Sequence, residues 1–176
     1  MDIRGVQRSG AAPTRIVHVG RTADGERTFL GFGTRAPDTF ADAYFDALEL
    51  PSDLFDDVRF VVVGSLELAY ERSRNAIVRV VNEAHRCGGR VVFDVNRRPM
   101  FWTEAEAVFE RERALAIFAV ADYVKAGDDE ARWLFGTDEP RAIAGQGPAH
   151  GVLLTRGACS IRYSIERARR RHDRRR

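Results

Sequence analysis

The stretch Arg59-Phe60-Val61-Val62-Val63-Gly64-Ser65 is an apolar run that ends in a glycine and a serine. Such a run, with no polar alternation, predicts a strand that is buried on both faces of a sheet. Residues 68–86 then follow a helical period, and Gly88-Gly89 ends that pattern. The strand and the helix together form a unit that recurs along the chain and decides the fold class.

The same alternation continues after the first unit. We expect strands at residues 90–94, 122–125 and 150–155, helices at residues 103–118 and 128–135, and a return strand at residues 161–164. Alternating strands and helices connect through right-handed crossovers into a parallel sheet with helices on both sides. The predicted fold class is therefore α/β, a three-layer α/β/α sandwich with a mainly parallel sheet.

The N-terminal part of the chain has a different pattern. Residues 14–19 and 26–32 are β-prone, and the Ala23-Asp24-Gly25 segment between them is typical of a hairpin turn. Residues 36–57 contain two prolines and predict a connector with one or two short helical turns. We expect a small β-hairpin that lies outside the main sheet.

Composition limits the class of protein. Hydrophobic residues make up 44% and charged residues 31% of the 176 residues, as in ordinary globular domains. No apolar run approaches the roughly 20 residues that span a bilayer, so we expect no membrane association and a cytoplasmic location. The cysteines, Cys87 and Cys159, have no partner at metal or redox spacing, which disfavours a zinc site or a disulfide framework.

Charge is distributed unevenly between a domain at residues 1–166 and a tail at residues 167–176. The tail carries seven arginines and one aspartate, while the domain holds 21 basic and 25 acidic residues. A basic tail can bind nucleic acid through counterion release. Because arginine outnumbers lysine by 27 to one along the whole chain, we attribute the tail to composition. Nucleic acid is disfavoured as a partner, and we expect the tail to be disordered or a helix extension.

Ligands of parallel sheets bind beyond the carboxyl ends of the strands, so the residues that follow each predicted strand matter most. After the strand at residues 90–94 come an amide and a guanidinium, Asn96 and Arg98, where a polyanion can bind. The next strand runs into Lys125-Ala126-Gly127-Asp128-Asp129-Glu130, and the following one into Thr155-Arg156-Gly157. None of these loops is a dinucleotide-binding or Walker glycine motif.

These segments resemble motifs of the pfkB/ribokinase family of carbohydrate kinases, in particular its fructokinase-like branch. One family motif, Phe-Asp-Pro-Asn followed by an arginine and a Leu-Trp pair, is matched by Phe93, Asp94, Asn96, Arg98 and Trp102. Lys125 and Glu130 match a second motif, and Thr155 and Gly157 match a nucleotide loop. The chain departs from these motifs at Val95 for proline, Phe101 for leucine, Gly127 for asparagine and Ser160 for glycine.

The resemblance implies a ligand and a set of roles. In such a kinase ATP and Mg²⁺ are the cofactors and a sugar is the substrate. Asn96, Arg98 and Lys125 would bind the phosphates, Thr155 and Gly157 the nucleotide, and Glu130 the water shell of the metal. Gly127 still serves as a helix cap, although it lacks the polar side chain that the family has there.

The resemblance also implies a partial domain, incomplete at both ends. Family members hold the catalytic base and the transferred phosphate with a Gly-Ala-Gly-Asp motif, and the 176 residues contain no such motif. A helix N-terminus binds an anion and a carboxylate removes a proton, so the motif supplies both parts of the chemistry. We assign no catalytic residue and expect a chain that is inactive alone.

Other interpretations stand beside this one. The chain could instead be a non-catalytic binding or scaffold protein whose basic tail meets an acidic partner, and a homodimer is left open. A dehydrogenase of the Rossmann type is disfavoured because the phosphate-binding glycines are absent. Trp102 is more typical of a core anchor than of a sugar platform, and Glu104, Glu106, Glu110 and Glu112 are typical of a solvated helix face.

Overall fold

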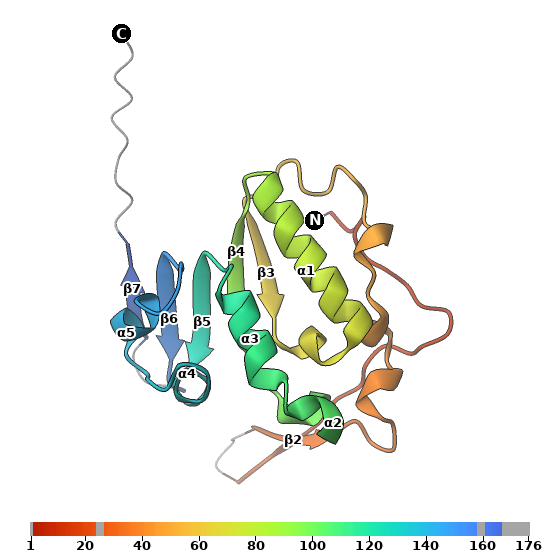
Figure 1. Ribbon diagram of the computed structural model, residues 1–176. Coiled ribbons are helices and arrows are strands. Elements are labelled where there is room, and N and C mark those ends of the chain that lie inside the picture. Colours follow the sequence, from red (N-terminus) through yellow and green to blue (C-terminus); the bar gives the residue numbers. More distant parts are fainter. Residues whose placement is uncertain (1, 24–26, 158–160, 167–176) are drawn as a thin grey trace.

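The computed structural model describes residues 2–23, 27–157 and 161–166 (Figure 1). These residues form a two-stranded and a five-stranded sheet, and the larger sheet has the strand order β3-β4-β5-β6-β7. Its strands are β3 Phe60–Gly64, β4 Arg90–Asp94, β5 Tyr123–Gly127, β6 Gly151–Thr155 and β7 Arg162–Ile165. The first four run parallel and β7 returns antiparallel to β6, which confirms the α/β class and the mainly parallel sheet.

Helices connect the parallel strands. The helices are α1 Glu71–Arg86, α2 Glu104–Ala107, α3 Glu110–Phe118, α4 Asp128–Phe135 and α5 Pro140–Ala144. The predicted helix at 68–86 starts three residues late, because the short 3-10 turn η4 Leu66–Ala69 precedes it. The predicted helix at 103–118 is split into α2 and α3, although Thr103 caps its start as expected by accepting a hydrogen bond from the Glu106 N–H.

The split brings one glutamate of this region into the interior. Glu110, which the sequence placed on a solvated face, is only 4% exposed and pairs with Arg97 at 2.8 Å. The expectation was wrong for this residue because the partner lies on a loop 13 residues away, which a helical pattern does not contain. Glu104 and Glu112 are exposed as expected.

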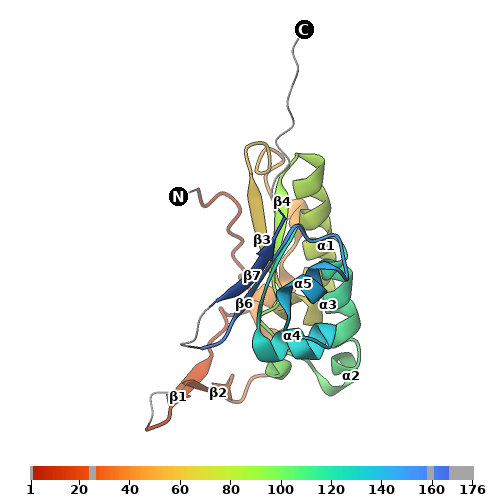
Figure 2. The ribbon, with the colours of Figure 1, turned by 90° about the vertical axis from the view of Figure 1, so that its left-hand side faces the viewer.

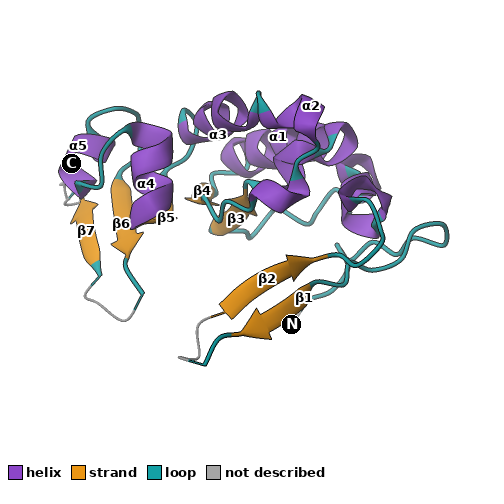
Figure 3. Ribbon diagram, turned by 90° about the horizontal axis from the view of Figure 1, so that it is seen from below, coloured by secondary structure: helices purple, strands orange, loops and turns teal. Residues whose placement is uncertain are grey.

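Helical cover lies on one face of the sheet. Among the described residues, α1, α3, α4 and α5 all lie on the same side (Figures 2 and 3). The side chains that point there, such as Val63, Phe93 and Val124, are at most 4% exposed. Phe60 and Val62 point the other way and are 56% and 69% exposed. The prediction that this strand, β3, is buried on both faces is therefore wrong for the described residues. The described residues therefore supply one of the two predicted helical layers.

The small sheet is the predicted hairpin. Strands β1 His18–Arg21 and β2 Arg27–Gly31 pair antiparallel and project beyond the carboxyl ends of the large sheet (Figures 1 and 2). The first strand begins four residues later than predicted, because Arg15 turns inward to pair with Asp42. The Asp24-Gly25 turn lies outside the described residues.

The connector that follows is described in full. It contains three 3-10 turns instead of one or two, namely η1 Pro37–Thr39, η2 Ala41–Tyr44 and η3 Ala47–Glu49, and a fifth such turn, η5 Pro99–Phe101, follows β4. None of the described helices combines the length and apolar character that a bilayer crossing requires. The tail at residues 167–176 lies outside the described part, so its state stays a prediction.

Candidate functional site

A cavity of about 570 Å³ opens at the carboxyl ends of β4, β5 and β6. Parallel pairing brings these ends together, since Asp94 is in register with Lys125 and Gly127 with Thr155. The six residues singled out from the sequence all line this cavity: Asn96, Arg98, Lys125, Glu130, Thr155 and Gly157. The structure therefore brings the three loops together, while the role of each residue stays a prediction.

Glu130 ties the first loop to the second. Its Oε2 accepts a hydrogen bond from the Gly127 N–H at 2.7 Å, and its Oε1 accepts one from the Arg97 N–H at 2.8 Å. The Arg98 guanidinium lies 3.7 Å from the same Oε1. Gly127 thus caps α4 without a side chain, because Glu130 reaches back to its backbone. The carboxylate positions the loop whether or not a metal is present.

The first loop has an unusual backbone at its start. Asn96 has a φ of 37°, and among the described non-glycine residues it is the one with a positive value. Asparagine tolerates this region better than most residues do. Asp94 and Lys125 close the base of the loop with an ion pair of 2.9 Å between Oδ1 and Nζ. The start of the loop is therefore held by the ion pair before any ligand binds.

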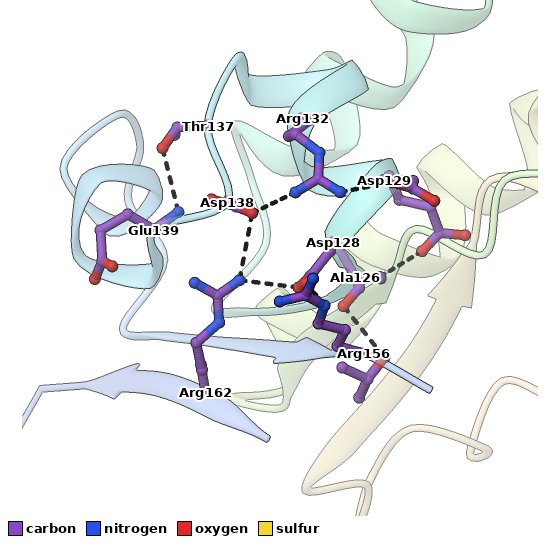
Figure 4. Close-up of polar contacts among 12 residues, drawn as sticks. Ala126, Asp128, Asp129, Arg132, Thr137, Asp138, Glu139, Arg156 and Arg162 are labelled. Atoms are coloured by element: carbon purple, nitrogen blue, oxygen red, sulfur yellow. Dashed lines mark hydrogen bonds and ion pairs between the residues drawn. The ribbon is translucent and has the colours of Figure 1, made fainter. Parts of the chain in front are cut away.

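Asp128 is a buried carboxylate in the first turn of α4, where a negative charge also favours the helix dipole. It is 6% exposed, its Oδ1 accepts a hydrogen bond from Arg162 at 3.0 Å, and its Oδ2 lies 3.5 Å from Arg156 Nε (Figure 4). Arg162 also approaches Asp138 at 3.5 Å. The sequence signal for this cluster is the pair Arg156, which follows β6, and Arg162, which begins β7, but only the fold shows that both meet Asp128.

The nucleotide-loop residues complete the third side of the cavity. Thr155 ends β6, and its hydroxyl lies 3.5 Å from the Ala126 carbonyl, a long hydrogen bond that leaves the Oγ1 available to a ligand. Gly157 has a φ of 49°, a backbone conformation that glycine adopts without strain. Ser160, which stands for a family glycine, lies outside the described residues.

The hairpin reaches this site. The guanidinium of Arg98 lies 5.1 Å from the ring centroid of Phe29 in β2. This is a cation–π contact between the large sheet's first loop and the hairpin. The contact joins a residue of the predicted phosphate loop to a segment 69 positions earlier in the chain. Movement of the hairpin would therefore change the position of the Arg98 side chain.

The electrostatics of the cavity suit an anion that can compete for paired cations. Each cation of the lining has a carboxylate partner: Arg98 with Glu130, Lys125 with Asp94, Arg132 with Asp129, and Arg156 with Asp128. The N-terminus of α4 also faces the cavity, and backbone N–H groups at a helix start favour negative charge. Phosphate groups, which accept many hydrogen bonds at once, fit such a site.

A divalent metal fits the same cavity if a phosphate ligand supplies some of its ligands. In the described part of the chain no three His, Cys, Asp or Glu side chains converge into a metal cluster. Mg²⁺ is commonly held by one or two carboxylates, by waters and by substrate phosphates. Glu130 uses part of its acceptor capacity on two N–H groups and keeps the rest. The donor set thus fits a metal that a phosphate ligand brings with it.

A second cavity of about 630 Å³ lies beside β3 and the connector. One of its lining residues is Arg15, whose side chain is 10% exposed and pairs with Asp42 at 2.7 Å. Four aromatic rings surround the guanidinium at 4.5–5.5 Å, from Phe32, Phe40, Tyr70 and Phe101. Arg15 Nη1 and Asp42 Oδ1 are buried and have no hydrogen-bond partner among the described residues. Sequence reading missed this cluster, because its members are scattered.

Burial shifts the pKa of Glu67, which lines this cavity, and that of Tyr70, which contacts Arg15. It raises the pKa of Glu67, and the neighbouring Asp42 carboxylate adds to the effect. Burial also raises the pKa of Tyr70 to about 12, so its hydroxyl, which accepts a hydrogen bond from Arg15 at 3.0 Å, stays protonated. The cavity therefore offers carboxyl and guanidinium groups together with the aromatic faces of Phe45 and Phe101.

Together the fold and the first cavity define an α/β protein with a polar cavity at the carboxyl edge of its sheet, where ligands of such sheets bind. The model of the pfkB family carbohydrate kinases matches residues 1–174. The chain belongs to this family, and the resemblance seen in its motifs is confirmed.

Individual relatives of the chain are consistent with this family assignment. The chain is 31% identical over 140 residues to probable fructokinase-7 of Arabidopsis thaliana, covering 80% of this chain and 39% of that protein. It is 33% identical over 138 residues to fructokinase-1 of Zea mays, covering 78% of this chain and 41% of that protein. The chain thus spans about two fifths of the length of these relatives.

Solved structures match in the same way. Fructokinase from Xylella fastidiosa, whose structure is known with bound ATP, superposes with a TM-score of 0.76 at 26% identity over 92% of this chain and 50% of that one. A Vibrio cholerae fructokinase bound to fructose, ADP and calcium ion shares the fold at 24% identity, with a TM-score of 0.68 and 48% of its length covered. The partial, ribokinase-like fold is confirmed.

Proposed function

We propose that the chain is part of a sugar kinase of the fructokinase type and that its first cavity binds the phosphates of ATP. The observation that carries the proposal is that six residues from three loops, chosen from the sequence alone, line one cavity. Family membership supports it, and so do the relatives whose structures contain ATP, ADP and fructose.

The residues of the cavity would share the work of binding. Arg98 and Lys125 would exchange a carboxylate partner for phosphate oxygens, and the Asn96 amide would donate to the same group. The Thr155 hydroxyl and the Gly157 backbone would approach the nucleotide. Mg²⁺, when bound with the nucleotide, would neutralise phosphate charge, and Glu130 would face its water shell.

The second cavity supports an acceptor site for a polyhydroxylated substrate. Glu67 and Asp42 offer carboxylate groups for hydroxyls, the Arg15 side chain lines the same cavity, and Phe101 offers an apolar face. Both cavities lie at the end of the sheet where the parallel strands terminate, as transfer of a phosphoryl group between two substrates requires. A sugar of the ketohexose class is the proposed acceptor.

Binding and turnover are separate parts of this proposal. The 176 residues contain no Gly-Ala-Gly-Asp motif, so we expect ATP binding without kinase turnover by this chain alone. Loss of a general base costs about 10²–10⁴-fold in rate. An ATP-dependent assay with a panel of ketoses and nucleosides tests this part, and turnover near the 1–100 s⁻¹ typical of kinases would contradict it.

Titration calorimetry with a non-hydrolysable ATP analogue and Mg²⁺ tests the binding part. We expect Arg98→Ala to weaken the affinity about tenfold or more, because a charge-assisted contact to phosphate is lost. Arg72→Ala is the matched control, since Arg72 also forms an ion pair on the surface, with Asp46 at 2.9 Å, but does not line the cavity. Equal affinities of the two variants would refute the proposed phosphate site.

The alternative of a scaffold with a basic tail stays a prediction. Its central feature, residues 167–176, lies outside the described residues. A cytoplasmic location and a homodimer likewise remain predictions.

A further inference from the structure

Two adjacent arginines of the first loop have different surroundings. Arg98 lines the first cavity, whereas Arg97 is not among the lining residues. The Arg97 guanidinium instead donates two hydrogen bonds to the Glu110 carboxylate, from Nε to Oε1 at 3.1 Å and from Nη2 to Oε2 at 2.8 Å. Glu110 is the first residue of α3 and is only 4% exposed, so the carboxylate of this pair is removed from solvent.

A second helix also contacts Arg97. Its guanidinium lies 4.3 Å from the ring centroid of Trp133 in α4, where a cation and an aromatic face attract each other. Arg111 of α3 donates to the carbonyls of Trp133 and Leu134, at 3.2 and 2.8 Å, and so ties the two helices together. The side chains of Arg97, Glu110 and Trp133, here called the anchor, therefore connect the loop to both helices.

The anchor holds the backbone between two residues of the cavity. Arg97 lies between Asn96 and Arg98 in the chain. Its N–H donates to Glu130 Oε1 at 2.8 Å, and its carbonyl accepts a hydrogen bond from Arg98 Nη1 at 2.7 Å. The φ of 37° at Asn96 is uncommon for a residue with a side chain, and such a conformation persists where the surroundings impose it. A rotation of the Arg97 backbone would therefore move both neighbouring side chains.

Stability alone does not account for a buried ion pair of this kind. Desolvation of the two charges offsets much of their attraction, and in some proteins such pairs specify one conformation. The two parallel hydrogen bonds between Arg97 and Glu110 fix the orientation of the guanidinium as well as its position. The family motif matched Asn96 and Arg98 but assigned no part to Arg97 or Glu110.

We propose that Glu110 is a positioning residue that holds the first loop through Arg97. The loop in this conformation presents Asn96 and Arg98 to the phosphates of a nucleotide, so the inference rests on the proposed function of the first cavity. Glu110 itself does not line that cavity. A loop that is already ordered loses less conformational freedom when a ligand binds, so removal of the anchor lowers the affinity without removing a contact to the ligand.

Titration calorimetry with a non-hydrolysable ATP analogue and Mg²⁺ tests the proposal on the full chain. We expect Glu110→Gln to weaken the affinity about fivefold or more, because the charged partner of Arg97 is lost. Glu106→Gln is the matched control. Glu106 lies on α2 and pairs with Arg74 and Arg113, which belong neither to the loop nor to the cavity lining, so its affinity should stay unchanged.

A double-mutant cycle gives a readout that a general loss of stability would not change. If Glu110 acts through the loop, Glu110→Gln should weaken binding at most about twofold in a chain that already carries Arg98→Ala, since the main side chain to be positioned is gone. Arg97→Lys keeps the charge but not the planar fork, and it takes the place of Glu110→Gln in the cycle if that variant does not fold. Losses that simply add would overturn the proposal.

Amide hydrogen exchange separates this inference from the proposed function. Without nucleotide, the Arg97 N–H should exchange about tenfold faster in Glu110→Gln than in the wild type, and at the wild-type rate in Glu106→Gln. Equal exchange in the two variants, or an unchanged affinity of folded Glu110→Gln, would also overturn the proposal. A folded wild-type chain that does not bind the analogue would refute the proposed function instead, and the exchange rates would still decide whether Glu110 holds the loop.

Discussion

Glu67 lies at the border between the interior and the second cavity. Burial disfavours its charged form and raises its pKa, so the folded protein binds the proton more tightly than the unfolded chain does. By linkage, this contributes stability that is present below the ordinary glutamate value of 4.5 and is lost as the pH rises through the raised value. An ionised Glu67 is therefore a local cost to the fold near neutral pH.

We expect Glu67→Gln to remove this pH dependence. From pH 4.5 upward toward pH 7 the free energy of unfolding of the wild-type chain should fall relative to that of the variant, because the unfolded wild-type chain releases the Glu67 proton at a lower pH than the folded one does and glutamine has no such proton. Urea denaturation followed by circular dichroism at several pH values measures the difference. Glu112→Gln, at an exposed position on α3, is the control, and an identical pH profile for both variants would refute the assignment.

The junction between α1 and β4 shows how a helix end fixes the position of the next strand. Gly88 has a φ of 79°, its N–H donates to the His85 carbonyl, and the Gly89 N–H donates to the Ala84 carbonyl at 2.8 Å. This pair of bonds is the Schellman arrangement that ends many helices. A Cβ on Gly89 would lie 2.8 Å from the Val58 carbonyl oxygen, so the chain leading into β3 packs against this turn.

Substitution at this junction should destabilise the fold. We expect Gly89→Ala to cost about 2 kcal/mol or more, because the methyl group meets backbone atoms that cannot rotate away. Gly145→Ala is the control, since Gly145 has an ordinary φ of −73° and meets no atom closer than 3.6 Å. Urea titration distinguishes the two, and similar midpoints would show that the turn tolerates a side chain.

At the scale of the whole molecule, the domain and the tail carry net charges of opposite sign. Residues 1–166 are net acidic, and residues 167–176 carry seven of the 27 arginines. Long-range attraction between the tail and a polyanion is screened within about 8 Å at physiological salt. The acidic domain also repels the same polyanion, so the tail alone would have to hold a nucleic acid.

We therefore expect deletion of residues 167–176 to leave the affinity for duplex DNA or RNA unchanged at about 0.15 M salt. Fluorescence anisotropy with a labelled duplex compares the full chain and the shortened chain across salt concentrations. A salt-dependent affinity that disappears with the deletion would favour the scaffold interpretation instead.

The sequence by itself determined the alternation of strands and helices and the three loops of the candidate site. Periodicity and turn residues are local, and the carboxyl ends of parallel strands always meet at one edge, so Asn96, Lys125 and Thr155 could be placed together without coordinates. Boundaries were less certain, as the late start of β1 shows.

Tertiary structure alone decided which polar groups are buried and which face of the sheet is covered. Glu110 and Asp128 are buried because their arginine partners come from other elements, and Arg15 lies among aromatic rings from four separate segments. The apolar run Phe60–Gly64 is a strand in either case, but its exposure depends on what packs against it. Burial results from contacts between distant segments, and a local pattern of residues does not contain them.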